Sequence, residues 1–302
     1  MDHTVVEGTV VENRGALFEV DVEGRRIMCL LRGKLKRDKR TQAAPLAAGD
    51  RVKLALLEPG RGVIEQVLPR TSGLSRRAAG SVPLAQTLAA NVDQAVIVFA
   101  AAEPRANFYF LDRFVVMATA SGLDQIVCIN KCDLVAADAL GEDYALYSRI
   151  GCRLIFASAH RGDGIAELRA ALTDRRSVMC GPSGVGKSSL LNALAPGLSL
   201  RTTEIGYTTH KGRHTTTSMT LLQLPFGGWI ADTPGLRQVG FHELGRDDIV
   251  AAFPDLHPYL GRCRYSSCAH QQEEGCAIRV AAEAGAVSAR RVKSFLQMGG
   301  AR

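Results

Sequence analysis

The sequence predicts a protein of three domains: a β-barrel of the OB type over residues 1–70, a central α/β domain over 71–240, and a mostly helical, metal-binding domain over 241–302. Three observations lead to this prediction. Short segments of alternating polar and apolar residues fill the N-terminal part. From about residue 91, apolar strand-like runs alternate with amphipathic helical segments, and cysteines cluster close to the C-terminus.

The composition excludes several classes of protein. Apolar residues make up 46% of the chain and charged residues 22%, which is the balance of a folded protein and excludes disordered, collagen-like and coiled-coil chains. No apolar run approaches the roughly 18 residues that a membrane-spanning helix needs. The first residues are acidic where a secretory signal is basic. We therefore expect a cytoplasmic protein without membrane contact.

The N-terminal part contains five strand-like stretches separated by turn residues. They are 4–11, 16–22, 26–31, 51–56 and 62–67. Five strands in about 70 residues are typical of an OB barrel, a fold that commonly binds oligonucleotides. The alternative is another small β-barrel that serves as an interaction module. Residues 68–77 break the alternation, which predicts a linker.

A basic run lies between the third and fourth of these strands. The net charge of +7 is unevenly spread, and residues 31–40 carry basic side chains against Asp38 alone. The basic residues are Arg32, Lys34, Lys36, Arg37, Lys39 and Arg40. The run predicts contact with a polyanion. The alternative is a solvated loop that its like charges keep extended.

The central part predicts a mostly parallel sheet covered by helices. The strand-like segments are 94–101, 125–129, 153–157, 177–180, 219–224 and 229–231. The helical segments are 107–121, 136–150, 165–172 and 187–195. Beyond about residue 241 the sequence turns helical and ends in a basic tail, which we expect to form a separate small unit. The tail contains Arg290, Arg291, Lys293 and Arg302.

A phosphate-binding loop lies between the strand at 177–180 and the helix at 187–195. It reads Gly181-Pro182-Ser183-Gly184-Val185-Gly186-Lys187-Ser188, and Ser189 follows it in the predicted cofactor-binding set. Backbone N–H groups of such a loop wrap the phosphates. Lys187 places a cation on the β and γ oxygens, and the Ser188 hydroxyl is positioned to hold Mg²⁺. The loop predicts a nucleoside triphosphate without specifying its base.

The base is indicated by Asn130-Lys131-Cys132-Asp133, which closes the strand at 125–129. The carboxylate of Asp133 can accept from the ring N1–H and the exocyclic amine of guanine, whereas adenine offers no such pair of donors. Ser158 and Ala159 close another strand and can supply a backbone N–H to the guanine carbonyl. Taken singly, the four-residue motif is also an ordinary strand-to-helix turn with a capping aspartate. Beside a phosphate loop, it predicts selectivity for guanine.

Two further segments predict contacts to Mg²⁺ and the γ-phosphate. Asp232-Thr233-Pro234-Gly235 follows a strand, which places Asp232 to hold Mg²⁺ through water and the Gly235 N–H near the γ-phosphate. A plain turn is the alternative. In the segment 212–217, Thr216 is the favoured hydroxyl ligand of the metal, with Thr215 second.

The catalytic residues are less clearly indicated. Leu236 stands where many small GTPases place a glutamine that orients water, so we expect slow intrinsic hydrolysis. The predicted catalytic set is His214, Thr216 and Lys187. Either His214 moves in, or a partner completes the site. The alternative for His214 is a purely structural hydrogen bond.

A metal site is predicted near the C-terminus. Cys263, Cys268, His270 and Cys276 follow one another with four, one and five intervening residues. Three thiolates and one imidazole suit one tetrahedral Zn²⁺ with no open position, which makes the site structural. The alternative is three unrelated thiols and a solvent-facing histidine. The cysteines at 29, 128, 152 and 180 lie in apolar segments and are expected to be buried thiols.

The order of the motifs resembles that of the circularly permuted GTPases. The base-reading motifs at 130 and 158 precede the phosphate loop at 181, and joining the original termini through residues 173–176 restores the usual succession of strands and helices. With the N-terminal barrel and the cysteine cluster, essentially the whole chain is similar to the bacterial ribosome small subunit-dependent GTPase A family. The resemblance implies that GTP, GDP, Mg²⁺ and Zn²⁺ are bound.

The resemblance also implies a partner and a role. The small ribosomal subunit and its rRNA would bind the flanking domains and stimulate GTP hydrolysis, and the protein would act in late maturation of that subunit. Separately from the resemblance, we expect a monomer. Because the segment after Asp232 runs directly into the C-terminal unit, nucleotide state is expected to reposition this unit.

Two other functions remain open from the residues alone. An ATP-driven nucleic-acid motor shares the phosphate loop, a carboxylate after a strand and a basic surface, and competition by ATP against labelled GTP would identify it. A non-catalytic RNA-binding scaffold would use the nucleotide site only as a stabilising pocket. Phosphate release measured with and without small subunits would identify the scaffold, because the subunits would not change the rate of release.

Overall fold

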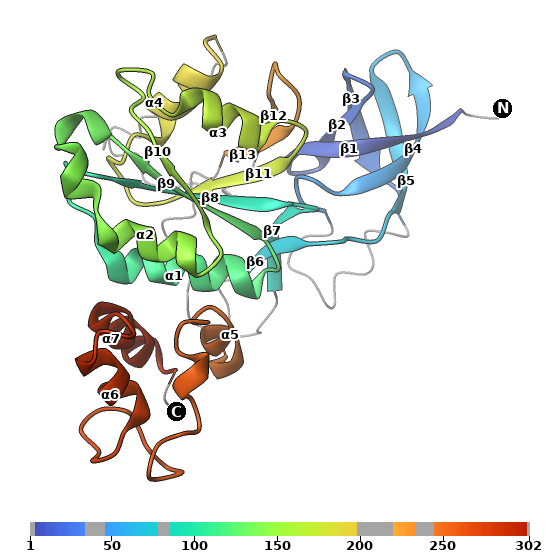
Figure 1. Ribbon diagram of the computed structural model, residues 1–302. Helices are drawn as coiled ribbons and strands as arrows, with labels where there is room; N and C mark the ends of the chain where they lie inside the picture. The colour runs from blue at the N-terminus through green and yellow to red at the C-terminus, as the bar shows by residue number, and fades with distance from the viewer. Residues whose placement is uncertain (1–3, 34–45, 78–84, 198–219, 233–244, 301–302) are drawn as a thin grey trace, which may run out of the picture.

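The computed structural model describes residues 4–33, 46–77, 85–197, 220–232 and 245–300. Figure 1 shows a barrel at one end, a sheet with helices on both faces in the middle, and a helical unit below the lower helix layer. Among the described residues, no helix has the length and the apolar character that crossing a bilayer requires.

The barrel strands are β1 Val5–Arg14, β2 Leu17–Val22, β3 Arg25–Leu31, β4 Arg51–Glu58 and β5 Arg61–Val67. Neighbours follow the order β1-β2-β3-β5-β4, and β4 pairs again with β1, which closes the barrel. Among these described strands, β3 and β5 form a parallel pair, and the other neighbouring pairs are antiparallel. Alternate side chains such as Val10, Phe18 and Leu54 fill its interior. The predicted OB-type barrel is confirmed. One face of each strand lies inside the barrel, as the period-2 pattern predicted.

The central sheet is parallel, as predicted. Its strands are β8 Gln94–Ala100, β9 Asp124–Asn130, β10 Arg153–Phe156, β11 Arg176–Cys180 and β13 Trp229–Asp232, in the order β10-β9-β8-β11-β13. The strand β12 Thr220–Gln223 runs antiparallel to β13 and meets β1 of the barrel at the pair Glu12 and Thr220. Every residue of β8 is buried, which fits a strand covered on both faces.

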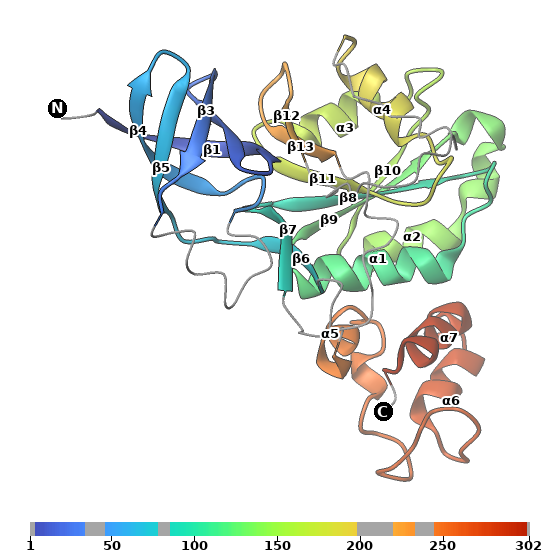
Figure 2. The same ribbon diagram turned by 180° about the vertical axis from the view of Figure 1, so that it is seen from behind.

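Helices cover both faces of the sheet, as Figures 1 and 2 show. The helices α1 Phe108–Ala120 and α2 Glu142–Arg149 lie on one face, and α3 Ile165–Leu172 and α4 Lys187–Leu194 lie on the other. The side chain of Asn107 caps α1 by accepting from the N–H groups of Tyr109 and Phe110. One-turn 3₁₀ helices lie at Cys132–Leu134, Ala137–Leu140 and His257–Tyr259.

Two sequence predictions for this part need correction. The helix expected over 136–150 begins only at Glu142, after Gly141, because glycine costs conformational entropy in a helix interior and favours a boundary. The linker expected over 68–77 is wrong beyond residue 72. The strand β6 Gly73–Arg77 pairs with β7 Ala85–Ala90, and Leu74 is buried against the main core.

The C-terminal unit contains α5 Arg246–Ala251, α6 Ala277–Glu283 and α7 Ala289–Met298. Its core contains Phe253, Leu256 and Phe295, and Val116 of α1 belongs to the same cluster. Two residues of the basic tail contact the central domain or its neighbours, because Arg291 is fully buried and Arg290 lies against α1 and α2. The domain limits 1–70, 71–240 and 241–302 stay a prediction.

The cysteines in apolar segments are buried, as expected. Burial raises the pKa of the Cys29 and Cys152 thiols to about 11, and that of the Cys128 and Cys180 thiols to about 12. These thiols are therefore protonated near neutral pH and behave as small apolar side chains.

Candidate nucleotide and metal sites

The predicted nucleotide motifs meet at one edge of the sheet. The segments after β9, β10 and β11 all leave the carboxyl ends of parallel strands, where ligands bind in open α/β sheets. The loop after β11 leads into α4, whose first N–H groups have no partner within the helix. This arrangement can hold an anion at the start of α4.

Two glycines allow the phosphate-binding loop to adopt its path. Gly181 has φ +138°, and a Cβ atom there would lie 2.0 Å from the Val98 carbonyl oxygen. Gly186 has φ +90°, and a Cβ atom there would lie 2.3 Å from Asn130 Nδ2. Any other residue would therefore push the loop away from the neighbouring strands.

Asn130 connects the segments that follow β9, β10 and β11. Its Nδ2 donates to the Val185 carbonyl at 2.9 Å, and its Oδ1 accepts from the Ala159 N–H at 3.1 Å. The side chain is only 1% exposed, so these hydrogen bonds are shielded from water. The structure thus brings the phosphate loop, the Asn130–Asp133 segment and the Ser158–Ala159 segment into one site.

Asp133 is held by a neighbour that the sequence did not single out for this purpose. The Ser158 hydroxyl donates to Asp133 Oδ1 at 2.5 Å and accepts from the Arg161 N–H at 3.0 Å. The hydrogen bond from Ser158 lowers the pKa of Asp133. The carboxylate is therefore ionised at neutral pH, which leaves it able only to accept hydrogen bonds, as guanine recognition requires.

The backbone N–H groups of Ser158 and Ala159 already have partners. Ser158 N–H donates to the Asp163 carbonyl at 2.9 Å, and Ala159 N–H donates to Asn130. A guanine carbonyl at this place would therefore share the Ala159 N–H with Asn130 Oδ1. Sequence spacing could not reveal this competition, because it arises from the contact between two loops.

The two lysines of the motifs lie on backbone carbonyls. Lys187 Nζ donates to the carbonyls of Gly181 at 2.8 Å and Pro182 at 2.6 Å, over the phosphate loop. Lys131 Nζ donates to the Glu103 carbonyl. In the first turn of α4, Ser188 and Ser189 are exposed. Their hydroxyls are therefore accessible to a ligand.

Several predicted site residues are only partly placed, or not placed, by the structure. Asp232 ends β13, one position after the register pair Val178 and Ala231, so its backbone lies beside the phosphate-loop strand. His214, Thr215, Thr216, Gly235 and Leu236 lie outside the described residues. Their expected roles stay predictions.

The predicted metal ligands converge. The donor atoms of Cys263, Cys268, His270 and Cys276 all lie within 4.8 Å of one another. The sulfurs of Cys263 and Cys276 are 4.0 Å apart, and His270 Nδ1 lies 3.4 Å and 3.5 Å from them. A tetrahedral zinc with Zn–S bonds of about 2.3 Å needs sulfurs about 3.8 Å apart, so the donor set fits this ion.

The loop between these ligands is held by Glu273. Its carboxylate accepts from the N–H groups of Ala269, Gln271 and Gln272 at 2.8 to 3.0 Å. Backbone hydrogen bonds, first from Glu273's own N–H and then from that of Ala269, lower the pKa of Glu273 to about 2. Burial lowers the pKa of His270, which favours the neutral imidazole that binds metals. The cluster could therefore hold a metal ion.

Comparison with known proteins gives consistent matches over the whole chain. A family model described as RsgA GTPase matches residues 67–242. A protein of Moorella thermoacetica is 42% identical over 291 residues, which are 96% of this chain and 95% of that protein. One of Gemmatimonas aurantiaca is 43% identical over 298 residues, which are 98% and 97% of the two chains. Both are described as small ribosomal subunit biogenesis GTPase RsgA.

Two solved structures are also similar. The crystal structure of YjeQ from Thermotoga maritima matches with a TM-score of 0.78 and 34% identity, over 98% of this chain and 97% of that one. The crystal structure of YloQ, described as a circularly permuted GTPase, matches with a TM-score of 0.72 and 29% identity, over 98% and 94% of the two chains.

Proposed function

The chain belongs to the RsgA GTPase family, and from this premise we propose that it acts on the small ribosomal subunit. It would bind this subunit, hydrolyse GTP to GDP and phosphate faster when bound there, and assist late maturation of the subunit. Membership makes the chain a GTP hydrolase, and the family generally binds GTP or GDP with Mg²⁺. The observation that carries the proposal is the pair of hydrogen bonds by which Asn130 joins the phosphate loop to the guanine-reading segments.

Specific residues are assigned to the nucleotide as part of this proposal. Asp133, fixed by Ser158 and kept ionised, would select guanine, and Lys131 would border the base. Lys187 would leave the loop carbonyls for the β and γ oxygens. The backbone N–H groups of Gly181 and of residues 183–189 would lie around the phosphates, since Pro182 has none. Mg²⁺ would neutralise phosphate charge, held by Ser188 and Thr216 and, through water, by Asp232.

The γ-phosphate side of the site rests on sequence alone. Gly235 would donate its N–H to the γ-phosphate, and His214 would take part in hydrolysis. The aliphatic Leu236 cannot orient water, so a partner that completes the site is expected to accelerate turnover. Membership in a family of GTPases argues against the two alternative functions, which were an ATP-driven motor and a non-catalytic scaffold.

The partner, the state of assembly and the location belong to the same proposal. The barrel and its basic run would contact rRNA of the small subunit. The residues 34–40 of this run lie outside the described residues, and Arg32 pairs with Glu65 at 2.7 Å. We propose a monomer that acts in the cytoplasm, where ribosomal subunits mature.

The proposal is tested by phosphate release from GTP with and without purified small subunits. We expect the subunits to raise the rate by about 10²-fold, because a partner that completes a GTPase site commonly has effects of this order or larger. Lys187→Ala is the control, since it removes the cation from the phosphates and should abolish the stimulated rate. Equal rates with and without subunits would refute the stimulated role while leaving the GTPase fold in place.

Binding to the small subunit is expected to weaken steeply with salt. Replacing Lys36, Arg37 and Lys39 by alanine should reduce the slope of log K against log salt by about 2 to 3, because each phosphate contact contributes about 0.7 to 0.9. The measurement is a binding titration at several salt concentrations. A slope that these substitutions leave unchanged would identify the run as a solvated loop.

We further propose that the cysteine and histidine cluster binds one structural Zn²⁺ per chain. Cys276→Ser should lose the bound zinc and lower the unfolding temperature of the C-terminal unit, because structural zinc sites contribute about 10 kcal/mol or more of apparent binding free energy to folding. Zinc content and thermal unfolding are measured together. The matched control is Cys152→Ala, a buried cysteine outside the cluster. Equal zinc content in both variants would contradict this assignment.

A further inference from the structure

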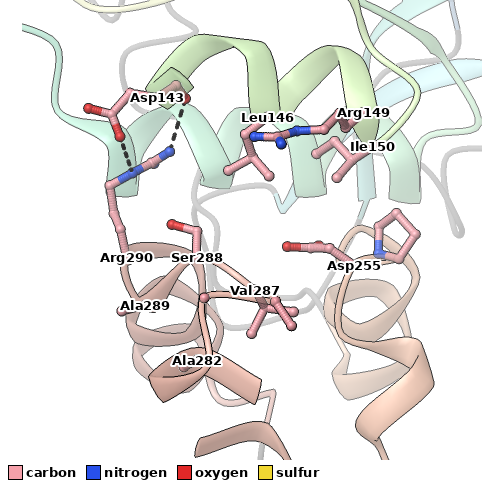
Figure 3. Close-up of a pocket in the computed structure, with 13 residues that line it drawn as sticks. Asp143, Leu146, Arg149, Ile150, Asp255, Ala282, Val287, Ser288, Ala289 and Arg290 are labelled. Carbon is pink, nitrogen blue, oxygen red and sulfur yellow. Dashed lines mark hydrogen bonds and ion pairs between the residues drawn. The ribbon is translucent and has the colours of Figure 1, made fainter. Parts of the chain in front are cut away.

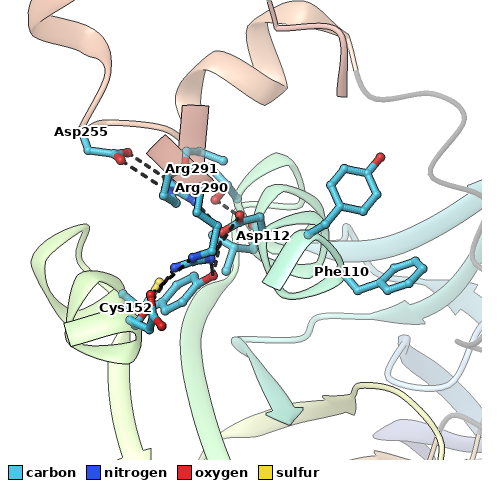
Figure 4. A network of polar contacts seen from close by, with 12 residues as sticks. Phe110, Asp112, Cys152, Asp255, Arg290 and Arg291 are labelled. Atoms are coloured by element: carbon cyan, nitrogen blue, oxygen red, sulfur yellow. Dashed lines mark hydrogen bonds and ion pairs between the residues drawn. The ribbon is translucent and has the colours of Figure 1, made fainter. Parts of the chain in front are cut away.

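The C-terminal unit is joined to the central domain through a buried group of charges, which Figure 4 shows. Arg291 of α7 and Asp112 of α1 are both fully buried, and Arg291 Nη1 donates to Asp112 Oδ1 at 2.8 Å. Arg291 Nη2 also donates to Asp255 Oδ1 at 2.9 Å and to the Ala252 carbonyl at 3.1 Å. The buried guanidinium is therefore paired on both sides.

The neighbouring Arg290 lies on an aromatic ring. Its guanidinium carbon is 3.9 Å from the ring centroid of Phe108, the first residue of α1. Its Nη1 donates to the Tyr147 hydroxyl at 3.2 Å, and that hydroxyl donates to Asp112 Oδ1 at 2.8 Å. Its Nη2 donates to the Asp143 carbonyl at 3.2 Å. Arg290 thus fixes the start of α1 and reaches α2.

A cleft lies beside this contact. It has a volume of about 680 Å³ and separates α2 from the segment that leads into α7. Figure 3 shows Leu146, Arg149 and Ile150 on its upper wall and Ala282 and Val287 on its lower wall, with Arg290 reaching Asp143 at one end. Arg290 therefore bridges the two walls at a place where they are otherwise apart.

Phe108 leads from this contact to the guanine-reading segments through aromatic rings. The ring centroids of Phe108 and Tyr144 are 5.2 Å apart, and those of Tyr144 and Phe156 are 6.2 Å apart. Phe156 ends β10 and directly precedes residues 157–159. Cys132 and Phe108 both pack against the core that contains Tyr144. A displacement of Phe108 would therefore loosen the packing behind the base-reading motifs.

A second route runs through the loop before α1. Residues 101–107 connect β8 to Phe108, and the Ala101 N–H donates to the Asn130 carbonyl at 2.8 Å. The Glu103 carbonyl accepts from Lys131, and Pro104 Cδ lies 3.6 Å from the position of a Cβ atom on Gly184. The loop that ends at Phe108 is thus hydrogen-bonded to the base-reading segment and lies beside the phosphate loop at Gly184.

We propose that Arg290 is a positioning residue for guanine-nucleotide binding, which couples docking of the C-terminal unit to nucleotide affinity through Phe108. The proposal rests on the nucleotide site proposed above. With Arg290 in place, the start of α1, the loop 101–107 and the aromatic rings are held in the arrangement that supports Lys131 and Asp133. This coupling is reciprocal. If docking of the C-terminal unit raises the affinity for the nucleotide by a given factor, a bound nucleotide raises the equilibrium constant for docking by the same factor.

The test compares dissociation constants for a fluorescent GDP analogue in the full-length chain. Arg290→Ala should raise the constant by about tenfold, within the usual range of coupling between sites. Arg290→Lys should recover part of the loss, because it keeps the cation but not the planar fork. Arg279→Ala is the matched control, since Arg279 lies in the same unit but forms an exposed pair with Glu283. It should bind GDP like the unmodified chain.

A second readout separates positioning from simple stability. In the unmodified chain, GDP should slow amide hydrogen exchange of α7, and in Arg290→Ala this protection should disappear. If Arg290→Ala proves poorly folded, Phe108→Leu gives the same test without removing the arginine, and it should also raise the constant. A folded Arg290→Ala or Phe108→Leu chain with an unchanged constant would overturn this inference alone. An unmodified chain that binds no guanine nucleotide would overturn the proposed function together with it.

Discussion

Asp133→Asn is expected to lower the affinity for GTP by about 10²-fold or more and to make xanthosine triphosphate the better ligand. The reason lies in hydrogen-bond polarity. In the proposed site, the Asp133 carboxylate would accept from two donors of guanine. Its pKa is lowered by the hydrogen bond from Ser158, so it is ionised near neutral pH. An amide in its place turns an NH₂ group toward one of these donors, while xanthine carries a carbonyl there and can accept from it.

Competition between the two nucleotides against a labelled guanine nucleotide measures this exchange of preference. Asp163→Asn is the matched control, because Asp163 lies in the neighbouring loop and its side chain pairs with Arg161 at 3.1 Å. The control should keep the preference for GTP. If Asp133→Asn keeps it as well, Asp133 does not read the base, and the assignment of the guanine site fails.

Arg291→Ala is expected to destabilise the protein by about 3 to 5 kcal/mol, because it takes from the fully buried Asp112 its nearer ionic partner and leaves only Arg290, at 3.8 Å. Burial alone would lower the pKa of Arg291, but the hydrogen bond to Asp255 and the charge of Asp112 raise it, so the guanidinium is charged in the folded protein. The loss should appear in urea unfolding followed by a signal from α7.

A second substitution shows whether the cost comes from the uncompensated charge. Adding Asp112→Asn to Arg291→Met should recover a large part of the stability, because neither of the two fully buried positions then carries a charge. The control is Lys293→Ala, an exposed residue on the same helix, which should change the stability by less than about 0.5 kcal/mol. If Arg291→Ala costs no more than this control, the buried pair does not hold the unit in place.

The buried pair also changes the expected movement of the C-terminal unit. The order of the segments suggested that nucleotide state repositions this unit, because the segment after Asp232 runs directly into it. A movement that separated Arg291 from Asp112 while either side chain stayed buried would leave an unpaired buried charge, which is costly. We therefore expect the unit to follow α1 rather than to swing freely.

The sequence by itself determined the elements whose signals are local. Period-2 alternation predicted the barrel strands, and β8 is buried along its whole length as its continuous apolar run indicated. The phosphate loop was readable because glycines such as Gly181 meet a backbone requirement that no other residue meets. The candidate metal-binding cluster could be predicted because the spacing of its four residues within one short segment limits how far apart they can lie.

Only the tertiary structure decided which segments and side chains contact one another. It paired β6 with β7 where a linker was expected, turned the Ser158 hydroxyl toward Asp133, and buried Arg291 against Asp112. The sequence alone had indicated only that Arg291 belongs to a basic C-terminal tail. The physical reason is that the environment of a polar side chain depends on which partners the fold brings to it, and a local pattern contains no information about a partner more than a hundred residues away.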